Sequence, residues 1–91
     1  MRIILVEDNL SLARGIENAL KDLGHAVDHL DEGLAAEAFL ARHSADVAVI
    51  DINLPGQSGI EIIRKLRGRG DPIPVLILTA QGKTSERVAG L

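Results

Sequence analysis

Short apolar runs punctuate the chain at regular intervals, and each is rich in β-branched residues. Runs of this length and composition are typical of β-strands buried on both faces of a sheet. A weaker run from Ala26 to Leu30 contains Asp28 and His29, which predicts a strand at the edge of the sheet. The three continuous runs are Ile3–Val6, Val47–Ile50 and Val75–Leu78.

Between these runs the apolar residues follow helical spacing. In the first such stretch we expect Ser11 as the N-terminal cap and Gly24 as the stop signal. Its apolar stripe is Leu12, Ile16, Ala19, Leu20 and Leu23. The same spacing predicts a second helix over 34–40 and a third over 60–67. A fourth is expected to begin near residue 84 or 85, where Thr84 and Ser85 are possible caps, and to continue to the end of the chain.

Strands that alternate with helices predict right-handed βαβ units, and therefore a parallel sheet with helices on both faces. We expect a doubly wound α/β fold with strand order 2-1-3-4, which places a switch point between strands 1 and 3. In such sheets ligands bind outside the carboxyl ends of the strands at that point. The carboxyl ends are therefore the place to look for chemistry.

The composition limits the class of protein. The 91 residues are enough for one domain, residues 1–91, and Phe39 is the single aromatic residue, so the core must be aliphatic. The chain has no cysteine, which excludes disulfides and thiolate metal sites, and its net charge of -3 argues against nucleic-acid binding by this segment alone. No apolar run reaches the ~18 residues of a membrane span. We therefore expect a cytoplasmic protein without a membrane segment.

Polar residues end three of the predicted strands on one rim: Glu7 and Asp8 follow the first, Asp51 ends the third, and Thr79 ends the fourth. Taken singly, each carboxylate is explained by turn or cap chemistry, and the Thr79 hydroxyl by a local backbone bond. Together they are harder to explain, because two like charges ~4 Å apart repel by about 4 kcal/mol at an effective dielectric of 20. A hard cation such as Mg²⁺ would relieve that repulsion, and Mg²⁺ leaves coordination positions for phosphate oxygens. Asp51 is then either a metal ligand or a nucleophile.

The segments "ILVEDN", "VIDINLPGQSGIEIIRKLR", "PVLILTA" and "SERVAGL" resemble, in order and spacing, the receiver domain of two-component response regulators. The resemblance implies a flavodoxin-like fold, with Asp51 as acceptor of a phosphoryl group from a sensor histidine kinase. It further implies that Glu7, Asp8, Asp51 and the backbone carbonyl of Asn53 hold Mg²⁺, and that Thr79 is the switch hydroxyl. The segments look most like regulators with a winged-helix DNA-binding domain, so any contact with DNA would be made by a domain outside this chain.

In this family the first helix docks the kinase, which implies a partner-binding role for Leu12, Ala13 and Ile16. The competing interpretation is that Leu12 and Ile16 belong to the apolar stripe that packs on the sheet. The three histidines, His25, His29 and His43, share no predicted face, and surface positions account for them.

One departure from the family concerns the C-terminal end. Receivers continue through a fifth strand that ends in a phosphate-binding Lys, and Lys83 does not match that position. We therefore expect a receiver that is incomplete at its C-terminus, lacks the fifth strand, and is impaired in phosphorylation or switching. The unpaired "VLIL" edge of the fourth strand would then favour self-association by edge pairing or by a swapped element.

Two other readings stay open at this stage. Metal-dependent phosphohydrolases of the haloacid dehalogenase type also use an Asp at a strand end, followed two residues later by a second Asp. Here the second position is Asn53, which has no ionisable carboxylate to protonate a leaving group. A pseudo-receiver that signals through protein contacts alone is the other alternative.

Overall fold

Five strands form a single sheet in the order β2-β1-β3-β4-β5, in which the first four strands are parallel and β5 is antiparallel to β4. This computed structural model describes residues 1–55, 57–79 and 87–90, without the side chains of residues 79 and 87–90. The strands are β1 (Arg2–Val6), β2 (Ala26–Leu30), β3 (Val47–Asp51), β4 (Val75–Thr79) and β5 (Arg87–Gly90), and the helices are α1 (Leu10–Asp22), α2 (Gly33–Arg42) and α3 (Gly59–Gly68). The predicted parallel order 2-1-3-4 is confirmed.

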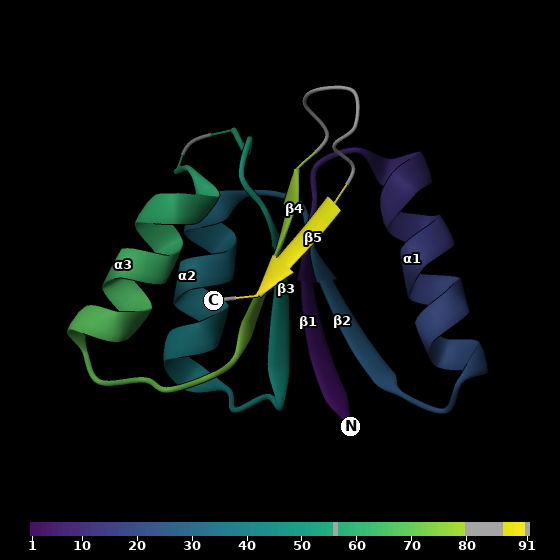
Figure 1. Cartoon of the computed structure of the whole chain (residues 1–91), viewed down its shortest axis with the longest axis horizontal. Helices are drawn as coiled ribbons and strands as arrows, with labels where there is room; N and C mark the ends of the chain where they lie inside the picture. The colour runs from purple at the N-terminus through teal and green to yellow at the C-terminus, as the bar shows by residue number, and fades with distance from the viewer. Residues whose placement is uncertain (56, 80–86, 91) are drawn as a thin grey trace.

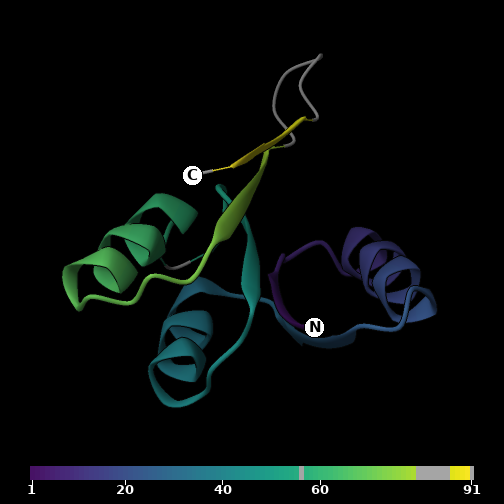
Figure 2. The ribbon, with the colours of Figure 1, turned by 60° about the horizontal axis from the view of Figure 1, so that its bottom comes forward.

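The helices cover both faces of the sheet, with α1 on one face and α2 and α3 on the other (Figures 1 and 2). Alternate residues of each central strand supply the two cores: Ile3 and Leu5 pack on the α1 face, whereas Ile4 and Val6 pack on the face of α2 and α3. All four of these side chains are buried. Both faces of β1 and β3 need apolar residues, and for this reason their sequences are continuous apolar runs.

Helix α1 differs from the prediction in its cap and its buried face. The side chain of Asn9, rather than Ser11, caps the helix by accepting from the Leu12 N–H at 3.0 Å. Ala13 is completely buried, while Leu12 is 43% exposed. Successive residues are about 100° apart around a helix, so a helix that turns Ala13 to the sheet turns Leu12 away from it. The predicted core position of Leu12 is therefore wrong.

The far end of that helix agrees better with the sequence. Gly24 follows the last turn with a positive φ of 94°, the left-handed conformation that a helix stop favours. Leu23, which the stripe placed in the core, is 73% exposed because it lies beyond the last helical residue.

The segment Arg87–Gly90 corrects two expectations. We predicted a helix there and a sheet without a fifth strand, whereas the structure has a strand that pairs Thr79 with Arg87 and Leu76 with Gly90. The polar backbone groups along the outer edge of β4 need partners, and an antiparallel strand supplies them within the chain. The expected self-association through a bare β4 edge thus loses its premise. The predicted caps Thr84 and Ser85, and Lys83, lie outside the described residues.

No helix in the described part of the chain combines the length and apolar character needed to cross a membrane.

Candidate functional site

Three carboxylates meet at the carboxyl ends of β1 and β3, at the top of the sheet in Figure 1. One oxygen each from Glu7, Asp8 and Asp51 lie within 4.8 Å of one another. Strands β1 and β3 are adjacent and in parallel register, with Val6 opposite Ile50, so Glu7 and Asp51, the next residue on each strand, lie side by side. The pairing predicted from strand order therefore brings together residues that lie more than forty positions apart in the sequence.

Two of these carboxylates are buried and anchored by backbone amides. Glu7 is 2% exposed, and its Oε2 accepts from the Asn9 N–H at 3.1 Å. Asp51 is 6% exposed, and its Oδ1 accepts from the Asn53 N–H at 3.2 Å. None of the ion pairs among the described residues involves Glu7, Asp8 or Asp51. The backbone thus orients the carboxylates, and their charge is not offset by a Lys or Arg in that part of the chain.

The electrostatic consequence falls on Glu7. Burial raises the pKa of Glu7 to about 7, the Asn9 N–H opposes that rise, and the negative charges of Asp51 and Asp8 add to it. A carboxyl group whose pKa lies this high is protonated in part near neutral pH unless a cation replaces the proton. The cluster is therefore a site where a proton and a metal ion compete.

The donor set fits a hard divalent cation. All three side chains offer carboxylate oxygens, and no histidine is among the ligand groups of this cluster. Mg²⁺ is bound through a small number of carboxylates plus oxygen ligands from substrate and solvent, whereas softer metals favour nitrogen and sulfur donors. The residues at this rim therefore fit Mg²⁺.

The loop after Asp51 folds back tightly on the strand. The Gly59 N–H donates to the Ile52 carbonyl at 3.0 Å, and the Ile52 N–H donates to the Leu78 carbonyl of β4 at 3.2 Å. A Cβ on Gly59 would lie closer than 3.0 Å to the Asp51 carbonyl oxygen. Glycine at this position thus permits the close approach of α3 to the end of β3.

The other predicted site residues are spread around this centre. Asn53 lies in the loop, two residues beyond Asp51, and its backbone N–H donates a hydrogen bond to the Asp51 carboxylate. Thr79 ends β4, which pairs with β3 through Leu78 opposite Asp51, and its side chain lies outside the described part.

The predicted partner-binding residues on α1 divide into three environments. Leu12 is exposed, Ala13 is fully buried, and Ile16 is half-buried against the α1-side core. A partner can therefore reach Leu12 and part of Ile16, whereas the sheet covers the Ala13 side chain.

Sequence reasoning missed one neighbour of the cluster. The His29 ring on β2 lies with Nε2 at 2.8 Å from the Glu7 carbonyl oxygen, and the Glu7 N–H donates to the Leu30 carbonyl at 3.0 Å. His29 is half-buried rather than on the surface. Its position in a β-strand opposite the end of β1 became informative only once the strand order was known.

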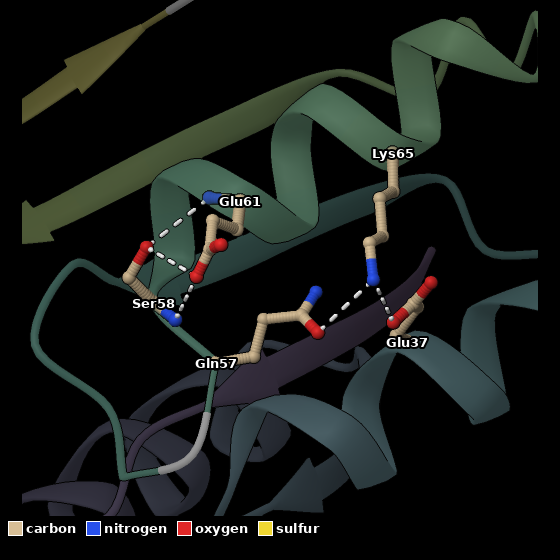
Figure 3. A network of polar contacts seen from close by, with 5 residues as sticks. All are labelled: Glu37, Gln57, Ser58, Glu61 and Lys65. Carbon is tan, nitrogen blue, oxygen red and sulfur yellow. Dashed lines mark hydrogen bonds and ion pairs between the residues drawn. The ribbon is translucent and has the colours of Figure 1, made fainter.

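A second missed group surrounds the far end of the loop. Gln57 is 6% exposed, and Lys65 of α3 lies between its side chain and Glu37 of α2 (Figure 3). Beside it, Ser58 and Glu61 form a capping box that begins α3. The Ser58-to-Glu61 spacing is a recognisable sequence signal, whereas nothing in the sequence around Gln57 predicts its burial.

Comparison with known proteins agrees with this geometry. The sequence profile of the response regulator receiver domain matches residues 3–91. The transcriptional regulatory protein TctD of Salmonella typhimurium and the response regulator PmrA of Pseudomonas aeruginosa are each 47% identical over all 91 residues. The response regulator MprA of Mycobacterium leprae is 38% identical over the same span. The chain spans 41% of the length of TctD and PmrA and 40% of MprA.

Solved structures give the same answer for the fold. The response regulator TrrA of Thermotoga maritima, crystallised with Mg²⁺ and BeF, superposes with a TM-score of 0.84 at 26% identity, over 89% of this chain and 70% of TrrA. The BeF3-activated receiver domain of Klebsiella pneumoniae RstA superposes with a TM-score of 0.83 at 31% identity, over 92% of this chain and 71% of RstA. The sequence profile, the relatives and the solved structures all identify a receiver domain, in agreement with the cluster of Glu7, Asp8 and Asp51. None of them favours the phosphohydrolase alternative. The chain belongs to the response regulator receiver domain family.

Proposed function

We propose that this receiver accepts a phosphoryl group on Asp51 from the phosphohistidine of a sensor histidine kinase, with Mg²⁺ held by Glu7, Asp8, Asp51 and the Asn53 carbonyl. The observation that carries the proposal is the cluster itself: three carboxylates within 4.8 Å, two of them buried, at the carboxyl ends of adjacent parallel strands. Such a cluster is costly without a cation, and it lies at the edge of the sheet where doubly wound folds bind their ligands.

In the proposed reaction an Asp51 carboxylate oxygen attacks phosphorus, and the bond between phosphorus and the histidine nitrogen breaks as the acyl phosphate forms. Bound Mg²⁺ would supply positive charge that offsets the negative charge of the transferred group. The Asn53 N–H holds one Asp51 oxygen and so orients the carboxylate. Glu7 and Asp8 contribute negative charge that attracts the metal ion. The chain is thus a phosphoacceptor that assists its own phosphorylation and dephosphorylation, rather than an enzyme acting on a separate substrate.

The remaining roles follow from position. Thr79 ends the strand next to β3, and we assign it the switch hydroxyl. For kinase docking, the exposed Leu12 and the half-buried Ile16 offer surface, while Ala13 supports the helix from inside. We further propose a cytoplasmic location and, in the whole protein, an output through a DNA-binding domain, in keeping with the transcriptional regulators among the relatives.

A small acyl phosphate or phosphoramidate tests the proposal. Incubated with either donor and Mg²⁺, the chain should gain the mass of a single phosphoryl group, whereas Asp51→Asn and a chelator should each abolish the gain. Asp46→Asn, which changes a carboxylate at the opposite end of the sheet, is the matched control and should leave the gain unchanged.

Three outcomes would contradict the proposal. An adduct that persists in Asp51→Asn places the acceptor elsewhere. No adduct with either donor shows that this 91-residue chain does not accept a phosphoryl group from small donors. Continued release of phosphate over many turnovers favours a phosphohydrolase.

A further inference from the structure

The geometry points to a positioning role for Gln57, Lys65 and Glu37, which we call the loop clamp. We infer that the loop clamp holds the described parts of the β3–α3 connection, residues 52–55 and 57–58, against α2 and α3, and thereby sets the place of the Asn53 backbone next to Asp51. The part of this inference that concerns Mg²⁺ binding rests on the proposed function.

Lys65 is the centre of the loop clamp. Its Nζ donates to the Gln57 Oε1 at 3.3 Å and to the Glu37 Oε1 at 3.3 Å, and Figure 3 shows the ammonium group between the two acceptors. The three side chains come from three separate elements: the loop, α3 and α2. One ammonium group therefore ties the end of the loop to both helices on this face of the sheet.

The backbone packs closely at the same point. Gly33, the first residue of α2, is buried, and a Cβ placed there would lie closer than 3.0 Å to the Gln57 carbonyl oxygen. The Gly33 N–H also donates to the Pro55 carbonyl at 3.5 Å. The loop thus lies directly on the start of α2, and a side chain that fixes Gln57 fixes this contact.

The buried Gln57 side chain is unfavourable for the stability of the fold. Its side chain is 6% exposed, and its Nε2 has no hydrogen-bond partner among the described residues. An apolar side chain of similar size would avoid the cost of burying an unpaired amide. What the amide does provide is an acceptor for Lys65, which is a directional contact that an apolar residue cannot make.

The other end of the loop reaches the candidate site. The Asn53 N–H donates to the Asp51 Oδ1 at 3.2 Å, and the Gly59 N–H closes the loop onto the Ile52 carbonyl at 3.0 Å. A short loop that is pinned at both ends has little freedom between them. Release of the Gln57 end should therefore loosen both of these amides.

Lys65→Met tests the loop clamp, because it removes the donor and keeps most of the aliphatic stem of a half-exposed side chain. Lys21→Met is the matched control: Lys21 is equally exposed and pairs with Glu17 at 2.7 Å on α1, away from the loop. In the metal-free 91-residue chain, the Asn53 and Gly59 amides should exchange with deuterium several-fold faster in Lys65→Met, measured by NMR, and at the wild-type rate in Lys21→Met.

Calorimetric titration with Mg²⁺ alone gives the second readout. Lys65→Met should weaken Mg²⁺ binding by about threefold or more, as loss of a supporting contact does at metal sites. The direction of the change in Mg²⁺ affinity is diagnostic, because removal of a positive charge would by itself strengthen the binding of a cation. Lys65→Arg, which restores the donor, should recover most of the wild-type affinity, and Glu37→Gln should give a smaller loss than Lys65→Met.

Unchanged exchange of both amides in Lys65→Met, or equal acceleration in Lys21→Met, overturns the loop clamp. Tighter or unchanged Mg²⁺ binding in Lys65→Met overturns its link to the metal site. If the wild-type chain itself binds no Mg²⁺, the proposed function fails, and the exchange measurement alone decides whether the loop clamp exists.

Discussion

Both ends of the parallel sheet carry carboxylates, and the carboxylates at the two ends have different partners. At the amino end, Arg2 donates to the Asp28 Oδ2 from Nε at 3.1 Å and from Nη2 at 2.8 Å, and its backbone N–H donates to Asp46 at 2.6 Å. The Asp28 carboxylate is therefore paired with a cationic side chain, whereas Asp46 accepts from a backbone N–H. At the carboxyl end, Glu7 and Asp51 are more deeply buried, and the only described donors to their carboxylates are backbone N–H groups.

The difference separates charges that are neutralised within the chain from charges that a bound cation would neutralise. A half-exposed ion pair such as that of Arg2 and Asp28 contributes little to stability and needs nothing from solution. A buried, unpaired carboxylate cluster opposes folding unless protons or a cation neutralise it. The ion pair of Arg2 and Asp28 thus needs no ligand, whereas the carboxyl end of the sheet is arranged for an external cation.

The largest expected effect comes from a glycine-to-alanine substitution made separately at each end of helix α3. Gly59→Ala places a methyl group against the Asp51 carbonyl oxygen and should lower the free energy of unfolding by about 3 kcal/mol or more. Gly68→Ala, at the other end of the same helix, meets nothing within 4 Å and should leave stability unchanged or slightly raised. Urea denaturation measures both. Equal effects would mean that the close approach at the carboxyl end is not structurally important.

The next effect contrasts Asp8 with Asp28. Mg²⁺ at about 100 times its dissociation constant should stabilise the wild-type chain by about 2.7 kcal/mol, and Asp8→Asn should lose most of that gain while Asp28→Asn keeps it. Without Mg²⁺ the two variants should move in opposite directions. Asp8→Asn relieves repulsion and raises the urea midpoint, and Asp28→Asn breaks the ion pair with Arg2 and lowers it. Changes of the same sign would remove the distinction between the two ends.

A pH titration of stability isolates Glu7. Its pKa is about 7 in the folded chain against an ordinary 4.5, so folding takes up a proton between these pH values. The metal-free chain should therefore lose stability as the pH rises from about 4.5 through 7, on the order of 2 kcal/mol in total, and change little through Glu7 above that. The groups beside Glu7 are Asp8, Asp51 and the His29 ring.

Glu7→Gln is the control for that titration, because the difference between the wild-type and variant curves isolates the contribution of the Glu7 carboxyl group. The variant should lose the downward slope between pH 5 and 7. An identical slope in both proteins would show that the proton is held elsewhere.

The smallest effect belongs to the amino end. Arg2→Met removes an ion pair whose side chains are 49% and 37% exposed, so it should cost roughly 0.5 kcal/mol or less. The loss should disappear in 1 M salt, where the screening length is only about 3 Å. A loss that persists at high salt would show that Arg2 acts through packing of its stem rather than through its charge.

Much of the fold could be predicted from local pattern. The three apolar runs are strands β1, β3 and β4, each one residue longer than predicted, and the weaker run is the edge strand β2. The three helices lie where the spacing places them. Continuous apolar runs can only be buried on both faces, which requires helices on both sides of a parallel sheet.

The failures of prediction have tertiary causes. The "SERVAGL" segment has helical spacing, yet Arg87–Gly90 pairs with β4, because an edge strand offers backbone partners that local spacing does not reveal. Leu12 has the spacing of a core residue, yet α1 is rotated on the sheet so that Ala13 is buried and Leu12 is exposed. The role of His29 and the burial of Gln57 likewise depend on neighbours that are distant in sequence.

The sequence by itself determined the four parallel strands, their order and the residue types that end them, because these depend on hydrophobic pattern and chain connectivity. It thereby indicated which carboxylates would meet. Only the tertiary structure decided that Glu7 and Asp51 are buried with no cationic partner among the described residues, that the pKa of Glu7 is raised, and that Lys65 ties the loop to α2. The reason is physical: desolvation and charge depend on everything packed around a group, and that environment comes from segments that no local pattern connects.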